Sequence, residues 1–131
     1  MKRFLVPTIL AACVATTVAF AANERVTVSF QTLQNSGVSG ELTLMSLPNG
    51  GTMIHGKIRG LTKDSDYTSN WYTDGSCGAT PGTELTRFRA KENGTANFNI
   101  KTDRSISDIE SISIFLNGET TLLACAPVTQ D

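Results

Sequence analysis

The chain has few of the side chains that most often bind transition metals or act as catalytic bases. Its 131 residues include one histidine, His55, and three cysteines. A Ser/His/Asp or Cys/His triad needs a histidine beside its nucleophile, and a metal centre built from imidazoles needs several of them. The counts exclude a multi-histidine metal centre, and no such triad can be assembled from the sequence.

Clusters of basic residues are also missing. Eleven lysines and arginines stand against twelve acidic residues, and no run of Lys or Arg forms a basic patch. Beyond residue 21 nine basic and twelve acidic residues remain, a net charge of −3. Nucleic acids and anionic membrane surfaces attract concentrated positive charge. We therefore expect no nucleic-acid partner and no polybasic membrane patch.

The long apolar run of the chain, residues 4–20, has the features of a secretory signal peptide. Lys2 and Arg3 precede it, and Ala19 and Ala21 place small residues where a signal peptidase cleaves. We predict cleavage after Ala21, so that residues 1–21 form the signal peptide and residues 22–131 form one folded domain. This domain is expected in the periplasm or the secreted space, with no membrane span.

A lipoprotein is the alternative for the same segment. Leu10-Ala11-Ala12-Cys13 fits a bacterial lipoprotein processing pattern, which would leave an acylated Cys13 as the mature N-terminus. Either route removes Cys13 from the thiols that can pair in the folded domain. Cys77 and Cys125 remain, and in an exported chain such a pair predicts one disulfide. Two unpaired buried thiols are the other possibility.

The hydrophobic pattern of the folded domain has a period of two. Val26 and Val28 alternate with threonine and serine, and Leu42 and Leu44 alternate with glutamate and threonine. Turn signals such as Asn117-Gly118 separate these short runs. Many short alternating strands with tight turns predict an all-β sandwich or barrel.

Several motifs resemble the bacterial copper/zinc superoxide dismutase family. Gly60-Leu61 resembles the turn that leads into the family's metal-binding strand, and Asn93-Gly94-Thr95-Ala96 resembles its Asp-Gly-Thr-Ala turn. The segment Leu122-Leu123-Ala124-Cys125 resembles its Arg-x-Ala-Cys motif. The resemblance implies a Greek-key β-sandwich or barrel of about eight antiparallel strands, with Cys77 paired to Cys125.

The positions that carry activity in that family are substituted in this chain. Asn70 and Tyr72 stand at the His-x-His pair, Phe115 stands at another histidine ligand, and Leu122 replaces the substrate-guiding arginine. An amide is a weak metal ligand and a phenol is protonated near neutral pH. We therefore expect a degenerate site with no copper or zinc, no cofactor, no catalytic residue and no superoxide dismutation.

Two interpretations of this degenerate site follow. We favour a structural one, in which Tyr72 and Phe115 fill the vacated space while Trp71 points into the core. The other is a pocket for a ligand or partner. The chain is thus predicted to be a non-catalytic binding or structural protein, whose partner is an unidentified protein or small molecule.

A second candidate site lies on one predicted hairpin. If Asn49–Gly51 forms a three-residue loop, Met45 lies directly across from His55, with Met53 on the same outer face. Two thioethers and an imidazole can bind Cu(I), which prefers soft ligands. The alternative function is therefore a periplasmic copper-binding protein. The simpler interpretation is an amphipathic outer face with ordinary surface methionines.

Overall fold

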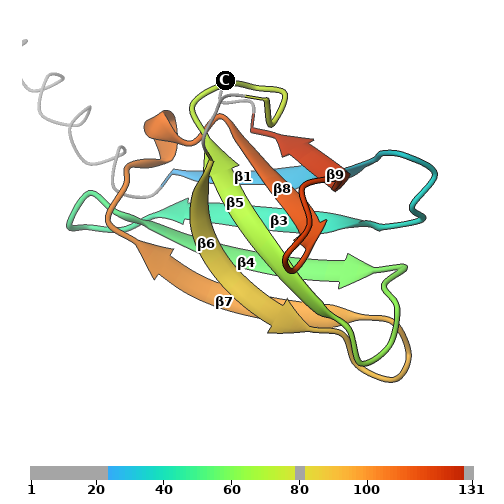
Figure 1. The fold of residues 1–131 in the computed structure, drawn as a ribbon. Coiled ribbons are helices and arrows are strands. Elements are labelled where there is room, and N and C mark those ends of the chain that lie inside the picture. The colour runs from blue at the N-terminus through green and yellow to red at the C-terminus, as the bar shows by residue number, and fades with distance from the viewer. Residues whose placement is uncertain (1–23, 79–81, 129–131) are drawn as a thin grey trace, which may run out of the picture.

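The computed structural model describes residues 24–78 and 82–128. The predicted signal peptide and Cys13 lie outside these residues. Nine strands of the described chain form two antiparallel sheets packed as a β-sandwich (Figure 1), and the all-β prediction is confirmed. One of the nine strands is only two residues long, which explains the sequence-based expectation of about eight. No helix among the described residues is long and apolar enough to span a membrane.

The two sheets contain four and five strands. The four-stranded sheet has the order β1 (Arg25–Ser29), β3 (Ser39–Ser46), β4 (Thr52–Arg59), β7 (Ala96–Thr102). The five-stranded sheet has the order β2 (Gln31–Thr32), β9 (Leu122–Pro127), β8 (Ser111–Leu116), β5 (Asp66–Tyr72), β6 (Thr83–Arg89). A short 3-10 helix, Ile106–Asp108, precedes β8. In Figure 1 strands β5, β6 and β8 run obliquely across those of the four-stranded sheet.

The core lies between the sheets and is built from alternate residues of each strand. The inward side chains of β3 and β4 are almost fully buried, namely Leu42, Leu44, Ile54, Ile58. Trp71 from β5 packs in the same cluster, as expected from its place between Asn70 and Tyr72. Burial of each such side chain stabilises the fold by roughly 1.5–3 kcal/mol. The alternation therefore fixes which residues of β3 and β4 face outward.

The Gly60-Leu61 turn is held by two other turns. The Leu61 amide donates a hydrogen bond to the Gly94 carbonyl at 3.0 Å. Gly60 has φ of +79°, and a Cβ atom at this position would overlap the Gly37 carbonyl oxygen. Only glycine fits both the backbone conformation and the close approach. The turn thus depends on two independent requirements at one residue.

We predict that Gly60→Ala destabilises the protein more than Gly118→Ala. Gly118 also has a positive φ, of +87°, but nothing lies within 4 Å of its added Cβ. Gly118→Ala should cost about 1–2 kcal/mol from left-handed strain alone, and Gly60→Ala roughly 2 kcal/mol more from the overlap. Urea unfolding of both variants measures this, and equal losses would contradict the steric argument.

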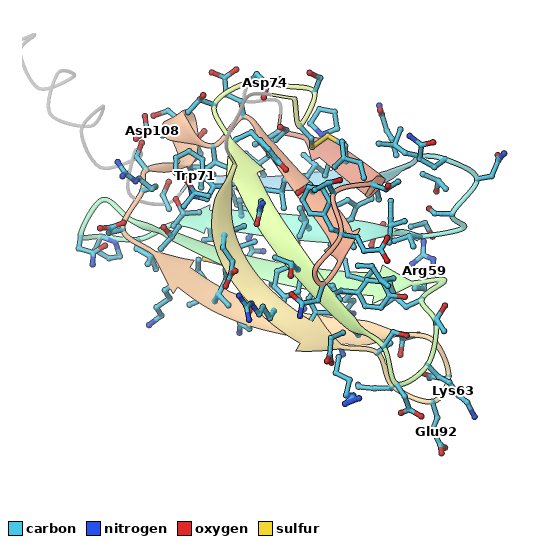
Figure 2. The ribbon with its side chains drawn as sticks, viewed as in Figure 1. Arg59, Lys63, Trp71, Asp74, Glu92 and Asp108 are labelled. Carbon is cyan, nitrogen blue, oxygen red and sulfur yellow. A yellow bond between two sulfur atoms is a disulfide. The ribbon has the colours of Figure 1, made fainter. Side chains whose placement is uncertain are left out.

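The predicted disulfide is confirmed. Cys77 and Cys125 are bonded, with Cα atoms 6.1 Å apart and a sequence separation of 48. The bond joins the loop after β5 to strand β9, and Figure 2 shows it at the same end of the sandwich as Asp74. It closes a long loop that contains three strands, so it restricts the unfolded chain strongly.

Replacing both cysteines by alanine should lower the free energy of unfolding by about 4 kcal/mol, the chain-entropy value for a loop of this length. Urea unfolding of the oxidised protein and of the Cys77→Ala/Cys125→Ala variant measures the difference. Alkylation with intact mass provides the control, because the native protein should take up no alkyl group at these two cysteines until it is reduced.

Candidate functional site

A pocket opens on the outer face of the five-stranded sheet. In β5 the side chains of Tyr67, Ser69 and Trp71 face the core, so Thr68 and Asn70 face outward. The pocket has a volume of about 330 Å³ and lies at this outer face. Four of its lining residues are the positions singled out in the sequence: Asn70, Tyr72, Phe115, Leu122.

These four residues come from three strands that are adjacent in the sheet. Asn70 and Tyr72 belong to β5, Phe115 to β8 and Leu122 to β9. Phe115 pairs with Thr68 on one side and with Leu122 on the other. The substituted positions therefore form one continuous surface, although up to 52 residues separate them in sequence. This juxtaposition is the main geometric finding at the site.

Two β-bulges flank the pocket. The pairing of β5 with β6 shifts between Ser69 and Asn70, and the pairing of β8 with β9 shifts between Ile114 and Phe115. Both shifts lie at the same position along the strands, because Ser69 of β5 pairs with Ile114 of β8. Bulges change the direction in which later side chains point. The second bulge skips Leu123 and brings Leu122 opposite Phe115.

Tyr72 forms the best-packed wall. Its side chain is only 5% exposed, and its hydroxyl lies 3.0 Å from the Ser113 hydroxyl in a buried hydrogen bond. Gly82 lies against the ring, since a Cβ there would come within 2.5 Å of the ring carbon Cε2. Phe115 is half-buried and packs in the same small cluster. Both aromatic residues therefore belong to the cluster around the disulfide, while a pocket remains open beside them.

The loop after β5 positions Cys77 and Gly78, which form one wall of the pocket. One carboxylate oxygen of Asp74 accepts hydrogen bonds from the Ser76 amide at 3.3 Å and the Gly78 amide at 3.1 Å. The Cys77 amide donates to the buried Ser111 hydroxyl at 2.9 Å. These bonds hold Cys77 at φ of +59°, a conformation uncommon for a residue with a side chain. The cysteine is thereby placed at the edge of the pocket.

The polar groups of the pocket carry little charge. Among the described lining residues Glu119 is the only one with an ionised side chain at neutral pH, and none is basic. The Oδ1 atom of Asn70 is closed to solvent and has no hydrogen-bond partner in the described structure. A buried acceptor left without a partner costs about 1–3 kcal/mol. Hydrogen bonding within the described chain therefore leaves this acceptor without a partner, which a bound ligand or water could supply.

Copper or zinc does not fit the substituted positions. Their side chains offer an amide from Asn70, a phenol from Tyr72 that is hydrogen-bonded to Ser113, and a phenyl ring from Phe115. Zinc is bound in proteins by imidazole, thiolate or carboxylate groups, and copper by imidazole, thiolate or thioether groups; none of these is present at the four positions. Within the described residues no three or more His, Cys, Asp or Glu side chains gather as a possible metal site.

The sequence did not reveal the other six lining residues: Thr68, Cys77, Gly78, Gly82, Glu119, Thr120. Thr68 could have been inferred, because it lies two positions before Asn70 on the same strand face. Glu119 and Thr120 follow the Asn117-Gly118 turn, a signal for a hairpin that brings β8 and β9 together. Nothing in the sequence indicates that Gly82 lies against Tyr72.

The predicted register of the methionine-histidine hairpin is wrong, although its faces are correct. Met45 pairs with Met53, and His55 pairs with Thr43. The three-residue loop is Pro48–Gly50 and not Asn49–Gly51, because the Leu47 amide donates to the Gly51 carbonyl at 2.8 Å. Moving the loop by one residue shifts the pairing by two, so every side chain keeps its face.

Comparison with models of known protein families finds no match to this chain, and comparison with curated proteins likewise finds none. The resemblance to copper/zinc superoxide dismutases rests on the residues of this chain.

Tyr72→Ala should cost more stability than Phe115→Ala. Tyr72 is buried and loses both its ring contacts and its hydrogen bond, which corresponds to about 4 kcal/mol. Phe115 is half-buried beside an open pocket, so its loss should be about 2 kcal/mol. Urea unfolding measures both, and Tyr72→Phe isolates the hydrogen bond at about 1 kcal/mol. A larger loss for Phe115→Ala than for Tyr72→Ala would show that Phe115 carries the packing.

Proposed function

We propose that this chain is an exported, non-catalytic binding domain related to the copper/zinc superoxide dismutases, and that the pocket on the outer face of β5, β8 and β9 is its binding site. One observation carries the proposal. The four positions at which the sequence departs from the dismutase pattern, Asn70, Tyr72, Phe115 and Leu122, line a single pocket.

The strand connections support the Greek-key part of this proposal. Strands β4 and β7 are neighbours in the four-stranded sheet, although β5 and β6 lie between them in sequence and belong to the other sheet. Such pairing of non-consecutive antiparallel strands is characteristic of Greek-key sandwiches. The disulfide between Cys77 and Cys125 and the predicted signal peptide support export to an oxidising compartment. Anchoring through Cys13 remains the alternative form of export.

The lining of the pocket indicates the class of ligand. Its volume lies at the lower end of the range for small-molecule sites. Tyr72, Phe115 and Leu122 provide apolar walls, Thr68 and Thr120 provide hydroxyl groups, and Glu119 provides a negative charge at an exposed position. Such a site suits a small apolar or aromatic group that is neutral or positively charged, either free or as a side chain of a partner protein.

The groups available in the described pocket support a non-catalytic role. Glu119 is its one ionised side chain, and Cys77 is held in a disulfide. His55 lies on β4 in the other sheet and cannot serve as a base here. A nucleophile paired with a base, the minimum for general acid-base or covalent catalysis, is therefore missing from the lining residues.

The neutral apolar fluorophore N-phenyl-1-naphthylamine tests the pocket. We expect saturable binding to the native protein, seen as a rise in fluorescence. Thr68→Trp places a large side chain at the pocket and should weaken this binding at least tenfold.

Thr43→Trp is the matched control. Thr43 is also a half-buried threonine in the middle of a strand, but it lies on the outer face of the four-stranded sheet. This variant should bind the probe like the native protein. Equal binding by both variants, or no binding by the native protein, would refute the proposed site, provided that urea unfolding shows both variants to be folded.

A further inference from the structure

The outer face of the four-stranded sheet gathers the soft metal-binding side chains of the folded domain. Beyond the initiator, the chain has two methionines and one histidine, and all three lie on β3 and β4. Met45 pairs directly with Met53, and His55 follows Met53 by two positions on the same face. Each of the three is half-buried. We call Met45, Met53 and His55 the methionine-histidine triangle.

The sheet geometry brings the three side chains within reach of one ion. Directly paired residues have Cβ atoms about 5 Å apart, and residues two apart on a strand are separated by about 7 Å. The diagonal from Met45 to His55 is about 7–8 Å. Each methionine sulfur lies two bonds beyond its Cβ on a flexible chain, and the imidazole extends a similar distance. Convergence on a shared ion therefore requires rotamer changes but no movement of the backbone.

We propose that the methionine-histidine triangle binds a soft monovalent metal ion, Cu(I) or Ag(I). Thioether and neutral imidazole ligands favour such ions, and both ions accept two or three ligands. The triangle lies on the opposite outer face of the sandwich from the pocket lined by Asn70 and Phe115. This proposal is therefore independent of the function proposed for the pocket.

The charges around the triangle favour a monovalent over a divalent ion. Arg25 of β1 pairs with Met45, and Lys101 of β7 pairs with Met53. Lys57 follows His55 on the same face and pairs with Glu41, which offsets its charge. His55 itself pairs with Thr43 of β3 and with Asn99 of β7, and both of these residues are neutral. The two uncompensated cations repel a divalent ion about twice as strongly as a monovalent one.

Titration with Ag(I), a soft monovalent ion that is stable in air, tests the proposal. Alkylation verifies that the disulfide is intact and that no free thiol competes for the ion. NMR follows the methyl groups of the methionines and the imidazole of His55. We expect one Ag(I) per chain and simultaneous shifts of Met45, Met53 and His55. Met45→Leu, Met53→Leu and His55→Gln should each weaken binding at least tenfold.

Thr43→Val is the matched control, because Thr43 pairs with His55 but offers no soft donor. It should leave the affinity for Ag(I) within twofold of the native value. If the three ligand variants bound Ag(I) as tightly as the native protein does, the proposed site would be wrong. Zn(II) or Cu(II) binding at the same three residues with equal affinity would overturn the assignment to a soft monovalent ion. If the three ligand variants lose Ag(I) binding but bind the fluorophore like the native protein, the two sites are separate.

Discussion

The bond between Cys77 and Cys125 is the constraint on which the pocket end of the molecule depends. It ties the loop after β5 to β9, while β5 and β9 are separated in the sheet by β8. The loop is otherwise held by short polar contacts, those of the Asp74 carboxylate and of the Ser111 hydroxyl. These contacts are individually worth about 1 kcal/mol, whereas the covalent bond acts on the whole 48-residue loop. Without it the wall formed by Cys77 and Gly78 would be held by hydrogen bonds alone.

The pocket itself arises from backbone irregularity in an otherwise regular sheet. A flat sheet would carry its outward side chains in even rows, and side chains as large as Tyr72 and Phe115 would cover the surface between them. The bulges at Ser69/Asn70 and Ile114/Phe115 interrupt this regularity on both sides of the β5–β8 pair. Bulged strands bend and twist more strongly. The pocket thus lies beside the points at which β6 shifts its pairing with β5 and β9 shifts its pairing with β8.

Strand faces could be predicted from the sequence, and exact pairing could not. Alternation alone placed Leu42 and Ile54 inside and Met45 and His55 outside, because the side-chain period of two is a property of any strand. The predicted hairpin register was wrong because the segment 47–51 permits two three-residue loops, Asn49–Gly51 and Pro48–Gly50. The choice between them depends on which amide closes the turn. Likewise, the sequence Leu122-Leu123 gives no sign that a bulge turns the first leucine toward the pocket. The resemblance implied the site positions and their convergence, whereas the pocket beside them and its other lining residues needed the structure.

The side chains of Asn70, Tyr72, Phe115 and Leu122 also differ from the dismutase pattern that they resemble in what they can recognise. Imidazoles and an arginine present donors and positive charge, which suit a metal ion and an anionic substrate. An amide, two aromatic rings and a leucine leave an uncharged surface, with Glu119 as the charged group among the described lining residues. Such a face offers no positive charge to attract an anion. Meanwhile the soft donors of the domain lie on the opposite sheet, so metal binding and recognition of an apolar group would each have a face of its own, separated by the hydrophobic core.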